Sequence, residues 1–165
     1  MDDILKQLEL SGTDRVEALS KMQAIVKSWG LKLPDVPACP LHFGLGDFYR
    51  VGETELDINN NVEQGYCGKF IFMFKGQICP WHHHRIKHET FFLVKGKVEF
   101  KTPGETMILD QGDRKIVHQN LKHEFTALED SLVLESSKPD LVDDSIFDDP
   151  RINQIIFGTG NPTFA

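Results

Sequence analysis

One stretch limits what this chain can become more than any other. It runs from Gly76 to Gly96 and reads GQICPWHHHRIKHETFFLVKG, a spacing of G-x5-H-x-H-x4-E-x6-G. Residues two apart in a β-strand point to the same face of a sheet. His82 and His84 therefore present two imidazoles side by side, and Lys87 and Glu89 share a direction after the turn. Two histidines and a carboxylate that converge from neighbouring strands suit a borderline divalent metal ion.

Length and charge set wider limits. A chain of 165 residues can bury a sizeable core, and we expect a single domain over residues 1–165. Its net charge of −7 argues against nucleic acid and against an anionic membrane surface as partners. The start MDDILKQLEL lacks the apolar segment of a secretory signal. The longest strongly apolar run, Phe70 to Phe74, is too short to span a bilayer.

The three cysteines, Cys39, Cys67 and Cys79, are odd in number, widely spaced and outside any C-x-x-C pattern. This favours reduced, half-buried thiols over a zinc-thiolate or redox role. We therefore expect a cytoplasmic protein.

The spacing of apolar residues separates three parts of the sequence. Residues 2–10 and 13–29 have helical spacing and belong to a predicted helical extension over residues 1–30. The apolar face of the second helix is expected to pack against the main body or against a dimer mate. After an irregular connector over residues 31–46, short segments alternate with turn signals over residues 47–136, which predicts an all-β sandwich or barrel. The predicted strands are Asp47–Val51, Glu53–Ile58, Lys69–Lys75, Ile78–His84, Glu89–Lys95, Lys97–Lys101, Glu105–Leu109, Lys115–His118, His123–Leu128 and Ser131–Glu135.

The tail over residues 137–165 is acidic at first and then apolar. We expect the aspartate-rich part to be a solvated loop. The apolar part is expected to pack back on the barrel through Ile152, Ile155, Ile156 and Phe157.

A second stretch, GDRKIVHQNLKHEFTA from Gly112 to Ala127, adds another candidate metal ligand. His123 begins a strand-like run in which His123, Phe125 and Ala127 face one way. Together with His82, His84 and Glu89 it provides three imidazoles and one carboxylate. Such a set suits Mn²⁺, Fe²⁺, Ni²⁺, Co²⁺ or Zn²⁺ and leaves one or two coordination positions open, which indicates that a water or a substrate oxygen binds the metal.

The other histidines are expected elsewhere. Strand alternation sends His83 away from His82 and His84, and we expect His83 and His88 outside the metal site. His42 lies in the connector, where a lone histidine is more often structural or solvated. The direction of His118 stays open because it precedes a predicted turn.

The two stretches resemble the two motifs of the cupin superfamily. Gly76, His82, His84, Glu89 and Gly96 match the first motif in full. The second motif usually reads G-x5-P-x-G-x2-H-x3-N; Gly112 and His123 match it, while the proline, glycine and asparagine are replaced by His118, Asn120 and Ala127. The resemblance implies an all-β cupin fold, a small double-stranded β-barrel or jelly roll, with the metal inside.

Further segments narrow the resemblance to one group of cupins. EQGYCGKFIFMFKGQICPWHHHRIKHET, HEFTALEDSLVLESS and DDSIFDDPRI resemble the D-lyxose isomerase-like cupins over roughly residues 40–153. These small ketol-isomerases act on D-lyxose and D-mannose. The resemblance implies a small sugar partner and a proton transfer between C1 and C2 through an enediol. It also implies a divalent metal, most readily Mn²⁺, that stabilises charge on O1 and O2.

Three residues beyond the ligands are candidates for catalysis and substrate binding. The resemblance puts a catalytic lysine at Lys87, whose alternative is a solvated lysine in the turn. Glu135 ends an apolar strand and is a candidate base at the pocket rim, with a rim salt bridge as the alternative. Arg151 resembles an arginine that could hold a sugar hydroxyl or the enediolate, and its alternative role is to pair with the surrounding aspartates.

The residues leave two alternatives to a sugar isomerase. A three-histidine, one-glutamate set also occurs in oxygen-using cupins, so a metal-dependent dioxygenase is the first alternative. The second is a non-catalytic sugar-binding cupin, which would bind without turnover. We expect a homodimer, because small cupins commonly pair and the N-terminal helices offer an apolar face.

Overall fold

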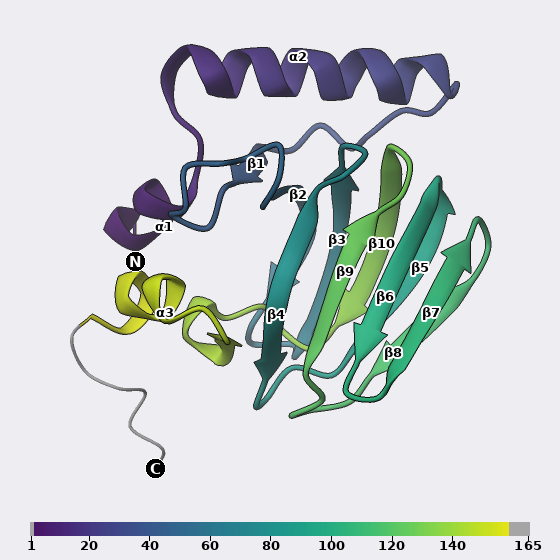
Figure 1. The fold of residues 1–165 in the computed structure, drawn as a ribbon. Coiled ribbons are helices and arrows are strands. Elements are labelled where there is room, and N and C mark those ends of the chain that lie inside the picture. The colour runs from purple at the N-terminus through teal and green to yellow at the C-terminus, as the bar shows by residue number, and fades with distance from the viewer. Residues whose placement is uncertain (1, 159–165) are drawn as a thin grey trace.

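The computed structural model describes residues 2–158 and contains two antiparallel sheets that enclose an apolar interior (Figure 1). In spatial order, the first sheet consists of β1 (Ala38–Leu41), β2 (Glu53–Asn61), β3 (Tyr66–Met73), β10 (Ser131–Ser137), β5 (Glu89–Lys95) and β8 (Arg114–Val117). The second sheet consists of β11 (Ser145–Phe147), β4 (Ile78–His84), β9 (His123–Ala127), β6 (Lys97–Thr102) and β7 (Glu105–Asp110). This arrangement confirms the predicted all-β jelly-roll fold.

Strand alternation decides which residues enter the barrel. In β3, Ile71 and Met73 belong to the core between the sheets, whereas Phe72 packs on the outer side of the first sheet. Lys69 has the same parity as Ile71 and Met73 and is only 2% exposed. The inner row of this strand therefore brings a buried cation into an otherwise apolar wall.

Helix α2 (Gly12–Ser28) lies across one end of the barrel (Figure 1) and packs against residues on the outer side of the first sheet. Its Met22 and Val26 are buried against Leu56 and Phe72. The expectation that this face packs on the main body is thus confirmed, although Val16 is 69% exposed. Because the sheet already covers this face, the homodimer stays a prediction.

Two short helices lie beside each other at one edge of the barrel (Figure 1). They are α1 (Asp2–Leu8) and α3 (Pro150–Phe157). Asp149 caps α3 by accepting a hydrogen bond from the Arg151 backbone N–H, with Pro150 in the first turn. Ile152 and Ile156 are buried in the core cluster of the barrel. Residues 159–165 of the predicted tail lie outside the described residues.

The strand prediction is wrong at the connector and incomplete in the tail. Asp47–Val51 forms a turn, because the Asp47 carbonyl accepts hydrogen bonds from the Arg50 and Val51 amides. The predicted connector contains β1, which pairs with β2. The tail contains the 3₁₀ turn η1 (Val142–Asp144) and β11, which pairs with β4. These elements depend on pairing across the fold and have little local signal. No helix within residues 2–158 is long and apolar enough to cross a membrane.

Candidate metal centre

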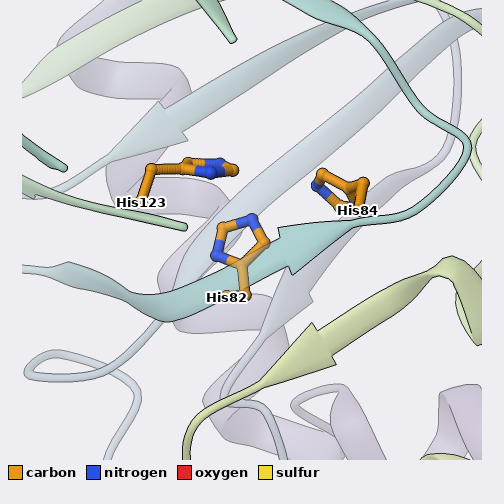
Figure 2. A group of neighbouring side chains, drawn as sticks. All are labelled: His82, His84 and His123. Atoms are coloured by element: carbon orange, nitrogen blue, oxygen red, sulfur yellow. The ribbon is translucent and has the colours of Figure 1, made fainter. Parts of the chain in front are cut away.

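Three of the four predicted ligands converge inside the barrel. His82 and His84 lie on β4, and His123 lies directly opposite His82 on β9. One ligand nitrogen from each ring lies within 4.8 Å of the other two, and all three side chains are buried. Figure 2 shows the three rings turned toward one space. The strand register therefore brings the three histidines together, as the spacing of the two motifs predicted.

Hydrogen bonds orient each ring. His82 Nδ1 donates to the Pro80 carbonyl at 2.8 Å, and His123 Nδ1 donates to the Leu121 carbonyl at 3.0 Å. His84 Nδ1 lies 3.3 Å from Ser145 Oγ on β11. A carbonyl only accepts hydrogen bonds, so the Nδ1 atoms of His82 and His123 carry the protons. Their Nε2 lone pairs are therefore free for a metal.

Burial keeps the rings in the form that binds metal. It lowers the pKa of His82 well below its usual range and, helped by Lys87, lowers the pKa of His84 to about 3. Both imidazoles are thus neutral at neutral pH, as a metal ligand must be. The His123 ring is also stacked on Phe100, with ring centroids 5.6 Å apart, which fixes its plane.

The fourth predicted ligand, Glu89, lies next to two of these histidines. Its Oε1 is 3.3 Å from His123 Nε2 and 3.5 Å from His84 Nε2. Within residues 2–158, these two nitrogens and both Glu89 oxygens are buried without an aligned hydrogen-bond partner. Leaving such atoms unpaired is costly, and a shared cation would satisfy all of them. The residues present therefore fit a divalent metal ion.

Lys87 is buried beside this group. Its Nζ lies 3.1 Å from Glu89 Oε2, 3.1 Å from Glu135 Oε1 and 3.2 Å from Asp140 Oδ1. Burial alone would lower the pKa of Lys87, but Asp140, Glu135 and Glu89 outweigh it and hold the pKa well above its usual range. Lys87 is therefore an ammonium ion inside the barrel, and its alternative as a solvated turn lysine is excluded by its 4% exposure.

The turn that carries Lys87 is held by a buried aspartate. The Asp144 carboxylate accepts hydrogen bonds from the backbone N–H groups of Arg85, Ile86 and Lys87 at 2.8–3.2 Å. Satisfying three consecutive amides fixes the backbone between β4 and β5. Asp144 thereby positions both Lys87 and the following Glu89.

A second lysine extends the polar network. Lys69 Nζ lies 2.5 Å from Glu55 Oε1, 2.6 Å from Asp140 Oδ2 and 3.9 Å from Glu135 Oε2. Asp140 and Glu135 thus lie between the two buried ammonium groups. The lysines, after the opposing effect of burial, hold the pKa of Asp140 below its usual range.

These groups surround a cavity of about 110 Å³. A single water needs roughly 15 Å³ on the same measure, so the space holds several water-sized groups. The apolar part of its wall comes from the barrel, from α1 and from α3, and includes Leu5, Leu8, Phe91, Phe125 and Ile156. The polar part includes His82, His84, Lys87, Glu89, Glu135, Asp140, Lys69, Glu53 and Glu55.

Arg151 lies outside this cavity. Its side chain is 71% exposed and pairs with Asp149 at 2.6 Å, which is the alternative role considered for it. Its position on the outer face of α3 gives no support to sugar binding by Arg151.

The remaining histidines also lie outside. His88 and His118 contact each other at the surface, with His88 Nε2 3.1 Å from His118 Nδ1. His118 is exposed and does not line the cavity, and His83 faces away from the three ligands. His42 Nδ1 accepts hydrogen bonds from the Gly44 and Gly46 amides, a structural role in the connector. Cys39, Cys67 and Cys79 are free thiols.

The altered second motif keeps its turn. Asn120 stands where the cupin pattern has glycine and adopts a φ of +62°. Asparagine tolerates this left-handed conformation better than other residues with a side chain. The Asn120 amide donates to the His84 carbonyl at 2.7 Å, so the loop before His123 stays attached to β4.

Sequence reasoning missed part of the site. Asp140 and Asp144 belong to the acidic tail that was expected to be a solvated loop, and both reach the site. Glu53, Glu55 and Lys69 were assigned to strands without a role. Of these three residues, Lys69 could have been found from the sequence. It has the same parity as Ile71 and Met73, which places it in the inner row of β3.

Comparisons with known proteins identify the family of this chain. The cupin domain family model matches residues 70–135. The D-lyxose/D-mannose isomerase of Thermosediminibacter oceani is 30% identical over 141 residues, which covers 68% of this chain and 77% of that protein. The D-lyxose ketol-isomerase of a Thermofilum species gives the same identity and the same coverage.

Solved structures confirm the fold at lower identity. The L-ribose isomerase of Cellulomonas parahominis with L-ribose superposes with a TM-score of 0.70 and 15% identity, over 91% of this chain and 97% of that chain. The L-ribose isomerase of Acinetobacter sp. DL28 with L-ribose superposes with a TM-score of 0.61 and 15% identity, over 75% and 79%. By sequence and by fold together, this chain belongs to the D-lyxose ketol-isomerase family of cupin sugar isomerases.

Proposed function

We propose that this protein is a metal-dependent aldose–ketose isomerase that interconverts D-lyxose with D-xylulose or D-mannose with D-fructose. One observation supports this above all: the Lys87–Glu135 pair lines the same cavity as His82 and His84 of the three-histidine cluster. A metal-binding barrel alone does not need a buried ammonium–carboxylate pair, since such a pair gives little stability. The names of the two curated relatives support the choice of sugars.

In this proposal His82, His84, Glu89 and His123 hold the metal. A bound divalent ion supplies positive charge that stabilises negative charge on substrate oxygens. We propose Mn²⁺ first, with Fe²⁺, Co²⁺, Ni²⁺ and Zn²⁺ as the other ions suited to three imidazoles and a carboxylate.

Glu135 and Lys87 divide the proton chemistry. Glu135 takes the proton from C2 and returns it to C1, because a carboxylate beside the cavity can accept and release the same proton. Lys87 donates hydrogen bonds to the substrate oxygen on which charge develops, since three carboxylates within 3.2 Å keep it an ammonium ion. This division assigns the base to Glu135 and the cation to Lys87.

The charges around the cavity favour an uncharged sugar. The carboxylates of Glu55, Glu89, Glu135 and Asp140, together with the carboxyl group of Glu53, face two ammonium groups. Both lysines are already paired with carboxylates. Neither ammonium group of this wall is therefore left free to pair with a phosphate or a sugar acid, whereas hydroxyl groups find both donors and acceptors.

The apolar wall of the cavity serves the same chemistry. Phe91 and Phe125 from the barrel, Leu5 and Leu8 from α1, and Ile156 from α3 border the cavity. They exclude bulk water, which strengthens the electrostatic contacts inside and protects a reactive enediol. The three free thiols support a reducing compartment, so we place the activity in the cytoplasm.

The test is a sugar panel. Protein loaded with Mn²⁺ is incubated separately with D-lyxose, D-xylulose, D-mannose, D-fructose and other aldoses, and the products are followed by NMR while dissolved oxygen is monitored. We expect interconversion of at least one aldose–ketose pair without oxygen uptake. A protein that leaves every sugar unchanged contradicts the proposal, and oxygen consumption with a small phenol or diketone would indicate a dioxygenase instead.

A further inference from the structure

The polar groups of the cavity form an almost closed series of contacts. Beginning at Glu89, contacts at 3.1–3.2 Å lead through Lys87 to Asp140 and Glu135. From Asp140 the series of contacts continues through Lys69 to Glu55. On the other side of the cavity, Glu53 and Cys79 lead back to His82, whose Nδ1 lies 3.9 Å from the Cys79 sulfur.

Glu53 is the member of this series that has one oxygen atom without a partner, because its only polar neighbour at hydrogen-bond distance among the described residues is the Cys79 thiol. It follows a turn into β2, has the same parity as Glu55 and is 4% exposed. Glu55 is neutralised by Lys69 at 2.5 Å. Glu53 Oε2, by contrast, is buried without a hydrogen-bond partner within residues 2–158.

The unpartnered atoms of the cavity thus fall into two groups. One group consists of the metal-facing atoms of His84, His123 and Glu89, which a cation would satisfy. The other is Glu53 Oε2, on a strand of the opposite sheet from His84 and His123. A buried oxygen without a partner is costly, so its retention beside a cavity points to a ligand that completes it.

Building on the isomerase function proposed above, we propose that Glu53 is a substrate-binding residue that takes a hydrogen bond from a sugar hydroxyl beyond C2. Glu53 touches no metal ligand directly, and the Cys79 thiol separates it from His82. The metal side of the cavity would then hold the reacting end of the sugar, while Glu53 selects ligands that carry a hydroxyl at the other end.

A hydroxyl fits this position better than a cation or an apolar group. Burial, with the neighbouring Glu55 carboxylate, raises the pKa of Glu53 to about 8. The side chain is therefore largely an uncharged carboxyl at neutral pH, with one donor and free acceptor capacity. A sugar hydroxyl also has both, so it matches this carboxyl in either protonation state.

The experiment measures binding, so it does not depend on turnover. Isothermal titration at pH 7 gives the Kd of D-arabinitol, which has the hydroxyls of acyclic D-lyxose, and of D-mannitol. Metal-loaded wild type is compared with Glu53→Leu, Glu53→Gln and Glu105→Gln. Glu105 lies on the exposed β7, so its variant is the matched control for loss of a carboxylate. Metal content and circular dichroism confirm that each variant is loaded and folded.

We expect Glu53→Leu to weaken polyol binding by about 10-fold or more, as the loss of a buried hydrogen bond predicts. Glu53→Gln, which keeps the shape and part of the hydrogen bonding, should weaken it by a smaller factor. Glu105→Gln should match wild type. The proposal is overturned if both Glu53 variants bind the polyols as wild type does, which would mean that a resident water completes Oε2. It is also overturned if wild type binds neither polyol.

The two proposals fail separately. If polyol binding depends on Glu53 but the protein isomerises no sugar, the proposed isomerase function is refuted and the proposed role of Glu53 in binding is supported. If the protein isomerises a sugar but the Kd of the polyols is the same in wild type and in the Glu53 variants, the isomerase function is supported and the role of Glu53 is refuted. In an active enzyme, Glu53→Gln should raise KM more than it lowers kcat, because Glu53 contacts a part of the sugar that does not react.

Discussion

The Lys87 ammonium nitrogen lies 3.1 Å from the Glu135 carboxylate, although 48 residues separate the two in the sequence. Pairing between β5 and β10 brings them together, with Ser137 opposite Glu89 and Glu135 opposite Phe91. Glu89 and Glu135 thus come from neighbouring strands, and the Asp144-held turn places Lys87 between them. The opposite charges of Lys87 and Glu135 offset part of the free-energy cost of burying each of them.

Glu135→Gln should remove most turnover and keep the metal. The amide preserves the shape of the side chain but cannot take a proton from C2, so we expect kcat to fall by about 10²- to 10⁴-fold. NMR of the sugar pair and metal analysis on the same sample check this. Glu105→Gln is the control and should retain wild-type rates. A Glu135→Gln variant with near wild-type kcat would exclude Glu135 as the base.

Lys87→Ala should abolish turnover, spare metal content and destabilise the fold. Glu89, Glu135 and Asp140 would lose their shared counter-charge in the interior, which costs about 3–5 kcal/mol of unfolding free energy. Urea denaturation measures that loss. Lys97→Ala removes a surface ion pair with Asp110 and should leave the free energy of unfolding almost unchanged. If Lys87→Ala changes only sugar affinity, the protein is a sugar-binding cupin and not an isomerase.

Activity and thermal stability should both depend on a bound metal, and metal binding should depend on His123. Treatment with a chelator is expected to abolish activity and lower the Tm of wild type, and Mn²⁺ should restore both, because a ligand that binds only the folded state stabilises it. His123→Ala should bind less metal and show little Tm response to added Mn²⁺. His118→Ala, at the exposed His88–His118 pair, should behave as wild type. An unchanged metal content in His123→Ala would refute the assigned ligand.

Glu53 should make the protein less stable as the pH rises. Burial, with Glu55 next, raises the pKa of Glu53 from 4.5 to about 8, against the opposing effect of Lys69; Cys79 and Glu135 are the other groups nearby. Between these values the folded state holds a proton that the unfolded chain has released, so rising pH favours unfolding. Urea denaturation at pH 5.5 and pH 8 should show Glu53→Gln gaining stability relative to wild type at the higher pH. A constant difference between the two proteins would contradict the raised pKa.

Two motif glycines should respond differently to alanine. Gly76 and Gly96 have φ values of +90° and +91°, so alanine strains the backbone at both. That strain costs about 1–2 kcal/mol. Only at Gly96 does a new Cβ also collide with backbone, with the Asp130 carbonyl and the Ser131 Cα closer than 3 Å. Thermal melting should therefore show a larger loss for Gly96→Ala than for Gly76→Ala, and equal losses would argue against this close approach.

Much of the fold and part of the site could be predicted from the sequence. The strands Ile78–His84 and Glu89–Lys95 have the predicted bounds, because their alternation and their flanking turns are local. Two-residue periodicity also put His82 and His84 on one face. By contrast, β1, β11 and the role of Asp144 could not be predicted, since each depends on a partner distant in the sequence.

By itself, the sequence determined an all-β barrel with a candidate metal site, because strand alternation and motif spacing are encoded residue by residue. Only the tertiary structure decided that Lys87 is buried, that Asp140 lies between Lys87 and Lys69, and that Arg151 points to solvent. It also decided that Glu53 lines the cavity with its Oε2 atom unpaired. The physical reason is that the environment of a charge depends on which distant strands and loops close around it, and local spacing carries no record of that.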